Sequence, residues 1–225
     1  MLLRRERLRF GLAVFGLSAL AVFLLSACSD SKPDAADTPA SANPSSSAPS
    51  SIPTASTPSL TPLPTPSGAW PTPKVTGEPE NDAPLADRIR FAIAKEAQIA
   101  AGKAAGTKVK CPGIETAETP GKHELTCTVS YAGKSYAGTL TIDAKQYSAS
   151  YKFTSESVAI VKPKVIDAVL RTAADAAKVT CTMDDVAVVK HSGAPIACDV
   201  TTTANAVQPY KAQVSGNGQV LVARA

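Results

Sequence analysis

The sequence predicts an α+β fold made of two tandem repeats, each with one helix packed on a small antiparallel sheet, after a long disordered linker. Three observations lead to this prediction. Apolar residues recur at helical spacing after residues 84 and 162, and apolar and polar residues alternate in the segments that follow. Four cysteines also recur with nearly the same spacing. Each repeat should run helix, short strand, loop and three-stranded meander, giving two layers.

The first repeat is expected over residues 85–155. Its helix begins behind Pro84 and should end by Gly102 or Gly106. The apolar stripe of this helix consists of Leu85, Ile89, Ala92, Ile93 and Ala97. A short strand at Val109–Lys110 should follow. Period-two alternation then predicts strands around Cys127, over 136–142 and over 147–153, with a turn at Ala132-Gly133-Lys134.

The second repeat is expected over residues 156–225, in the same order. Its helix should start near Pro163. The predicted stripe is Val165, Ile166, Val169, Leu170, Ala173 and Ala177. Strands are predicted at Val179–Cys181, around Cys198 and at 210–214. A final strand at 220–222 should follow the hairpin signal Ser215-Gly216-Asn217-Gly218.

Of the five cysteines, Cys28 lies near the N-terminus and the other four lie in the predicted repeats. Cys111 and Cys127 are separated by 15 residues, and Cys181 and Cys198 by 16. Four cysteines allow three pairings, and the repeated spacing favours Cys111–Cys127 and Cys181–Cys198. Because no closely spaced Cys-x2–4-Cys pair is present, zinc binding is not expected. Two structural disulfides are therefore predicted, and Cys28 is left over.

Cys28 ends a predicted secretory signal, residues 1–27. Four arginines with one glutamate form a basic start, and an uncharged stretch of 18 residues, Phe10 to Ala27, follows. Leu25-Ser26-Ala27-Cys28 fits a lipobox, in which the peptidase cuts before a cysteine that carries the lipid. An uncleaved membrane anchor and twin-arginine export through Arg4-Arg5 are the alternatives. All three place the rest of the chain outside the cytoplasm, and lipidation predicts attachment to the extracytoplasmic face of the cell membrane.

Residues 28–84 are predicted to be a disordered linker. Thirteen of the eighteen prolines of the chain lie between Pro33 and Pro84, among many Ser, Thr and Ala residues. Such a composition cannot bury enough apolar surface to offset its ordering entropy. Trp70 is the one large aromatic residue in this segment. We expect it to be an incidental exposed side chain; the alternative is that it packs the linker against a folded domain.

The net charge argues against nucleic-acid binding and against a polybasic surface that binds membranes. The whole chain carries a formal net charge of +4, but residues 1–27 hold four arginines and one glutamate, a net +3, so the remainder is close to +1. Neither nucleic-acid binding nor a polybasic membrane surface is therefore expected.

The sequence offers little catalytic chemistry. No Gly-x-Ser-x-Gly motif is present. His123 and His191 lie at different offsets from the cysteines, and the adjacent pair His191-Ser192 is a poor base and nucleophile. Asp184-Asp185 is expected to be a solvated turn or a cap. The tyrosines, Tyr131, Tyr136, Tyr147 and Tyr151, are expected to pack in the core or on a sheet face. No catalytic residue, cofactor or metal is predicted.

One resemblance concerns residues 85–225. The order of helix, Val-x-Cys-Pro, glycine-containing loop, Cys-Thr-Val strand and hairpin is similar to that of a small exported domain family of unknown function, found in actinobacterial lipoproteins. The matching positions are Val109, Cys111, Pro112, Gly121 and Cys127-Thr128-Val129, then Val179, Cys181, Gly193 and Cys198-Asp199-Val200. The second set lacks the proline after its first cysteine. The resemblance implies the fold and the envelope location, and it brings no catalytic residues.

The function expected from these observations is a membrane-anchored envelope lipoprotein that presents two disulfide-stapled binding or interaction domains. Its membrane contact would be the lipid on Cys28, and a wall polymer, a lipid or an envelope protein are the candidate partners. A structural or sensory spacer is the alternative. An envelope hydrolase is a third interpretation, against which the missing nucleophile motif argues.

Overall fold

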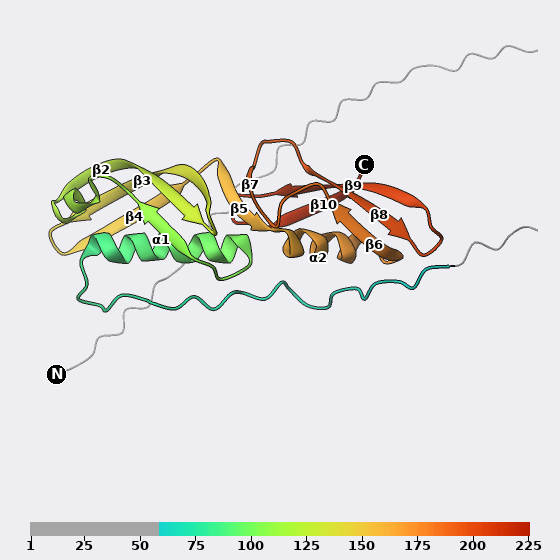
Figure 1. The fold of residues 1–225 in the computed structure, drawn as a ribbon. Coiled ribbons are helices and arrows are strands. Elements are labelled where there is room, and N and C mark those ends of the chain that lie inside the picture. The colour runs from blue at the N-terminus through green and yellow to red at the C-terminus, as the bar shows by residue number, and fades with distance from the viewer. Residues whose placement is uncertain (1–58) are drawn as a thin grey trace, which may run out of the picture. The chain divides into compact units, whose positions relative to one another are not determined.

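The computed structural model describes residues 59–225 and contains two helices and antiparallel sheets (Figure 1). This confirms the α+β class. The predicted signal segment, Cys28 and the linker up to residue 58 lie outside the described residues. The elements are α1 (Leu85–Ala101), β1 (Thr107–Lys110), a 3₁₀ helix (Ile114–Glu118), β2 (Gly121–Tyr131), β3 (Lys134–Lys145), β4 (Ser148–Thr154), β5 (Ser157–Val161), α2 (Lys162–Thr172), β6 (Ala176–Cys181), β7 (Val186–Lys190), β8 (Ile196–Thr202), β9 (Val207–Val214) and β10 (Val220–Arg224).

The first helix follows its apolar stripe. Ile89 and Ile93 are fully buried in α1, together with Ala86 and Ala97, and they face the core of the first sheet. The helix ends where Gly102 adopts a left-handed conformation with φ of 89°, which glycine reaches without a steric penalty. The predicted end at Gly102 is therefore correct.

The first sheet has the strand order β1-β2-β3-β4. β2 and β3 pair antiparallel over eleven residue positions, from Gly121 opposite Ala144 to Tyr131 opposite Lys134. The two-residue turn between them uses positive φ at Ala132 and Gly133, as the hairpin turns that match strand twist require. The strands and the turn predicted here are present.

The second four-stranded sheet has the order β10-β9-β8-β6. Its core contains the buried residues Val165 and Val169 of α2 with Val200, Tyr210 and Ala212 of the strands. The predicted helix was too long, because α2 ends at Thr172 and Ala177 belongs to β6 instead. Pairing of β6 with β8 takes up the backbone groups that a longer helix would have used.

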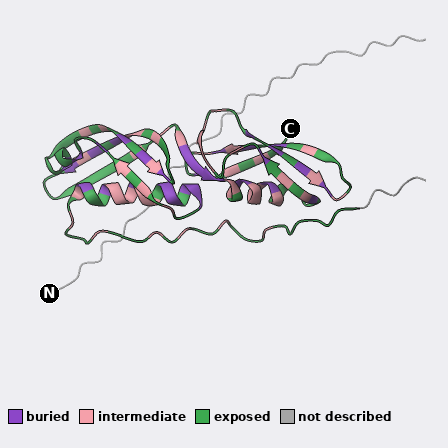
Figure 2. Ribbon diagram, in the orientation of Figure 1, coloured by how far each residue is buried: buried purple, intermediate pink, exposed green. Residues whose placement is uncertain are grey.

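Two strands lie outside the predicted order. β5 and β7 pair antiparallel as a separate two-stranded sheet. Four of the five β5 residues are buried, and Figure 2 shows this strand as largely buried. A third apolar cluster joins Ala159 and Val161 of β5 to Ala101 and Tyr131. Through β5, residues 156–225 thus pack against residues 85–155.

Both predicted disulfides are present. Cys111 is bonded to Cys127 and Cys181 to Cys198, with Cα–Cα distances of 4.2 and 4.0 Å. All four cysteines are at most 4% exposed and belong to the two larger apolar clusters. Each bond closes a short loop on its sheet.

We expect reduction of these bonds to lower the melting temperature by more than about 10 °C. Each loop of ~15 residues contributes about 3 kcal/mol in the chain-entropy model, and 1 kcal/mol shifts the melting temperature of a chain of this size by about 2–4 °C. Calorimetry with and without reductant, with thiol counting to verify reduction, measures the effect.

The matched control is a variant in which all four disulfide cysteines are changed to alanine: Cys111, Cys127, Cys181 and Cys198. Reductant should leave the melting temperature of that variant unchanged. An unaltered melt of the wild type after complete reduction would contradict a stabilising role for the disulfides.

Candidate functional site

The C-terminal end of α1 is where segments distant in the sequence meet. The last carbonyl groups of a helix have no partner within it, and here other elements supply donors. The Lys164 amine of α2 donates to the Ala100 carbonyl at 2.8 Å, and the Trp70 indole N–H donates to the Gly102 carbonyl at 2.8 Å. A cation at this end is also favoured by the helix dipole. Burial lowers the pKa of the Lys164 amine.

Trp70 packs its segment against the fold and is not an incidental exposed side chain. Its indole is partly buried beside the third apolar cluster, and a Cβ at Gly102 would meet the indole nitrogen at 2.7 Å. The less favoured sequence interpretation of Trp70 is therefore the correct one. Glycine at 102 makes this close approach feasible.

Other hydrogen bonds hold the segment that precedes Trp70. The Leu60 N–H donates to the Thr203 carbonyl at 2.9 Å, and the Leu63 N–H donates to the Ala176 carbonyl at 2.7 Å. The Arg171 guanidinium of α2 donates to the Gly68 carbonyl. Residues 59–84 contain no helix or strand. They differ from the prediction in being held against the folded residues.

The β9–β10 hairpin also contacts this end of α1. Gly218 has φ of +76°, and a Cβ there would overlap the backbone carbonyl of Ala100. The hairpin was predicted from its Gly-Asn-Gly signal. Its position against α1 was not predicted, because no local pattern relates residue 218 to residue 100.

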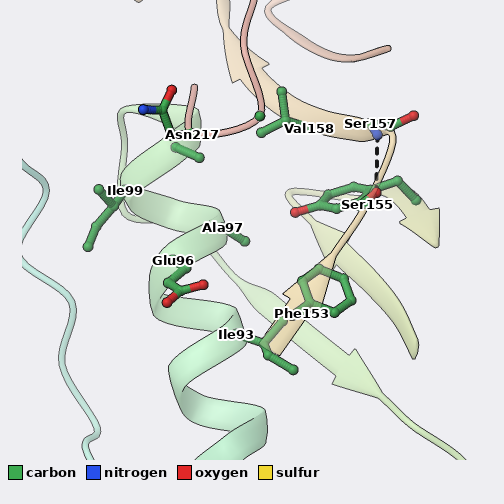
Figure 3. Close-up of a pocket in the computed structure, with 12 residues that line it drawn as sticks. Ile93, Glu96, Ala97, Ile99, Phe153, Ser155, Ser157, Val158 and Asn217 are labelled. Atoms are coloured by element: carbon green, nitrogen blue, oxygen red, sulfur yellow. Dashed lines mark hydrogen bonds between the residues drawn. The ribbon is translucent and has the colours of Figure 1, made fainter. Parts of the chain in front are cut away.

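A hollow of about 330 Å³ lies beside this contact (Figure 3). In Figure 3, Ile93 and Ala97 on α1 face the strand that carries Phe153, and Val158 and Asn217 lie at one end. The volume lies within the range of small-molecule sites. The lining residues are Ile93, Glu96, Ala97, Ile99, Ala100, Tyr136, Phe153, Ser155, Ser157, Val158, Gly216 and Asn217.

Some polar groups of the hollow are already paired. The Ser155 hydroxyl donates to the Ala137 carbonyl at 2.6 Å and accepts from the Ser157 N–H at 3.1 Å, the bond drawn in Figure 3. The Asn217 side-chain oxygen accepts from the Ser215 hydroxyl at 2.5 Å. These bonds shape the connector between β4 and β5 and the hairpin.

The phenol and the carboxylate of the hollow have no hydrogen-bond partner among the described residues. The Tyr136 hydroxyl makes no hydrogen bond in this part of the chain, and the Glu96 carboxylate makes no ion pair or hydrogen bond there. Burial raises the pKa of Tyr136 to about 12, so its hydroxyl remains a neutral donor at physiological pH. Both groups are therefore available to a ligand.

His191 supports the hollow from behind. Its Nε2 donates to the Ser155 carbonyl at 2.9 Å, and its ring lies against Gly216. Because a carbonyl only accepts, Nε2 carries a proton in this bond. Nδ1 is buried without a hydrogen-bond partner among the described residues. The ring thus fixes the backbone of a residue that lines the hollow.

The other candidate residues lie apart from this hollow. His123 bonds the Thr119 carbonyl at 2.8 Å. Asp184 forms an ion pair with Lys134 at 2.9 Å, and this hydrogen bond and charge lower the pKa of its carboxyl. Within residues 59–225, no group of three or more His, Cys, Asp or Glu residues is arranged to hold a metal ion.

The tyrosines divide between core and surface. Tyr131 is fully buried and donates its hydroxyl to the Lys103 carbonyl at 2.8 Å. Tyr136 lines the hollow, and Tyr151 is 41% exposed. Tyr147 is 90% exposed in the turn between β3 and β4, so packing in the core or on a sheet face was the wrong prediction for this residue.

The comparisons with known proteins found no match among family models, curated proteins or solved structures. The resemblance to an exported domain family therefore stays a prediction. Among residues 59–225, no helix is both long and apolar enough to cross a bilayer.

We expect Gly218→Ala to destabilise the protein more than Gly133→Ala. Both glycines have positive φ, of 76° and 82°, so both substitutions bring a backbone penalty of about 1–2 kcal/mol. A Cβ at Gly133 meets nothing within 4 Å, whereas one at Gly218 overlaps the Ala100 carbonyl. The hairpin must then shift, at a further cost of about 1–3 kcal/mol.

Urea unfolding of the two variants measures this difference in the free energy of unfolding. Equal losses in the two variants would contradict the close contact between the hairpin and α1.

Proposed function

We propose that the protein is a lipid-anchored cell-envelope protein that holds a binding module on the extracytoplasmic face of the membrane. Cys28 is the lipid site in this proposal. The hollow beside α1 is the binding site of the module. The protein acts by binding, without catalysis.

The observation that carries the proposal is the division of the cysteines. The chain has five, and the two disulfides use all of them except Cys28. Structural disulfides are typical of proteins that fold in oxidising compartments. Cys28 follows Leu25-Ser26-Ala27 at the end of an apolar stretch. A cysteine in that context, with no disulfide partner left for it, is the residue that a lipidation pathway modifies.

The hollow favours a binding module over a spacer. A spacer needs only length and stability, and it has no use for an apolar hollow that presents unpaired polar groups. Here Tyr136 and Glu96 offer a donor and a charge beside apolar walls. Small-molecule sites combine these same features.

We further propose that residues 85–155 and 156–225 are copies of one unit. The orders β1-β2-β3-β4 and β6-β8-β9-β10 correspond strand by strand, and each follows a helix. Each disulfide joins the segment around the first strand of its sheet to the second strand. β5 and β7 would then be an addition that packs the copies together.

Cys28→Ser should move the protein from the membrane fraction to the soluble or secreted fraction, and it should abolish incorporation of an alkyne fatty acid. Lipid attachment supplies the anchor, since each buried methylene contributes about 0.8 kcal/mol. Fractionation of the cells and intact mass of the mature N-terminus check this prediction.

Ser31→Ala is the matched control, because it changes a residue near Cys28 and leaves the lipid site intact. It should stay lipidated and in the membrane fraction. A mature protein that begins at Met1, or that carries an unmodified Cys28, would refute the anchor.

A further inference from the structure

The hollow beside α1 has a chemical character that narrows its ligand. The lining includes several apolar side chains: Ile93, Ala97, Ile99, Phe153 and Val158. Ile99 is 38% exposed although it is a large apolar residue. An apolar group of a ligand would remove these surfaces from water, at about 25 cal/mol for each Å².

The lining of the hollow contains one charged side chain. Glu96 is its only charged lining residue, and no Lys, Arg or His lines it. The nearby cation Lys95 lies over the Phe91 ring at 5.9 Å and within 3.7 Å of Glu78. Glu96 also acts on its surroundings, since burial and then the Glu96 charge raise the pKa of Tyr151. Glu96, which is exposed, thus offers an anionic partner at the hollow, whereas the nearby Lys164 amine is already bonded to the Ala100 carbonyl.

The hydrogen-bond donor of the hollow is the Tyr136 hydroxyl. Among the described residues, His191 Nδ1 is the one buried side-chain polar atom without a partner, so the Tyr136 hydroxyl is reached by water, which a ligand acceptor can replace. The hydroxyl of Tyr136 has no hydrogen-bond partner among the described residues, while the Ser155 hydroxyl is fully used within the fold. A ligand that offers an acceptor, such as a carbonyl oxygen, would satisfy it.

We propose that this hollow binds a primary ammonium compound with an apolar body and a neighbouring carbonyl group. Glu96 pairs with the ammonium, the Tyr136 hydroxyl donates to the carbonyl oxygen, and the apolar walls cover the body. This inference rests on the proposed binding function and names its ligand class.

The test uses phenylalaninamide as the probe and 3-phenylpropanamide as its matched partner, which lacks only the amine. The full chain, in phosphatidylcholine nanodiscs, carries labelled isoleucine methyl groups, and empty nanodiscs correct for partition of the probe into lipid. At about pH 6 the amine of the probe is protonated. Ile93 and Ile99 report on the hollow, and the buried Ile114 of the first core reports on the rest.

Phenylalaninamide should shift the methyl signals of Ile93 and Ile99 saturably and leave Ile114 unchanged. 3-Phenylpropanamide should bind about two- to fivefold more weakly, the range expected for one ion pair to an exposed carboxylate such as Glu96. Glu96→Gln should remove that difference, while Glu124→Gln, an exposed carboxylate on β2, should preserve it. Tyr136→Phe should weaken both probes by the same factor.

Two results would overturn the ligand class: no saturable shift at Ile93 and Ile99, or equal affinity of the two probes for the wild type. Either result can occur in a protein whose Cys28 is lipidated, and the anchor would then stand without this ligand. Conversely, selective binding to a chain with an unmodified Cys28 would support the site and refute the anchor.

Discussion

The free carbonyl groups at the end of α1 are the constraint on which the described part of the chain depends. Lys164, from α2, binds the Ala100 carbonyl, and Trp70, from the segment before α1, binds the Gly102 carbonyl. Gly218 brings the β9–β10 hairpin against the same turn. A helix end must find donors, and here it finds them in segments that lie 32 and 64 residues away. The end of α1 thereby contacts the segment around Trp70, the second helix and the last hairpin.

The hollow is a consequence of that arrangement. Its walls come from α1, from β3, β4 and β5 with the connector between the last two, and from the β9–β10 hairpin, so the position of the hairpin against α1 closes one side of it. His191 holds the connector through the Ser155 carbonyl and touches Gly216 of the hairpin. His191, interpreted from the sequence as a poor catalytic base, thus supports the backbone of a residue that lines the hollow. A ligand in the hollow would contact β3 and β4 of the first sheet and the β9–β10 hairpin of the second. Its binding would therefore stabilise the packing of both sheets.

Features with a local signal were predictable from the sequence. The α1 stripe, the Ala132-Gly133 turn and the cysteine spacing each depend on residues close together in the chain. β5 and β7 were missed because Val158–Val161 and Val186–Val189 are continuous apolar runs without alternation, and their partners lie about 30 residues apart. The hollow was missed because Ile93, Phe153 and Asn217 meet only through tertiary packing. The proline-flanked Trp70 was a usable signal, since a large aromatic residue in a polar linker gains from burial.

Fluorescence of Trp70 tests most directly whether the end of α1 gathers these segments. Trp70 is the only tryptophan of the chain, so emission excited in the indole band reports on this contact alone. With the indole packed beside Gly102, the native protein should emit at shorter wavelength than the urea-unfolded chain. It should also resist quenching by acrylamide, and Lys164→Met should partly remove both effects by loosening the same helix end. Native emission and quenching identical to those of the unfolded chain would contradict the account.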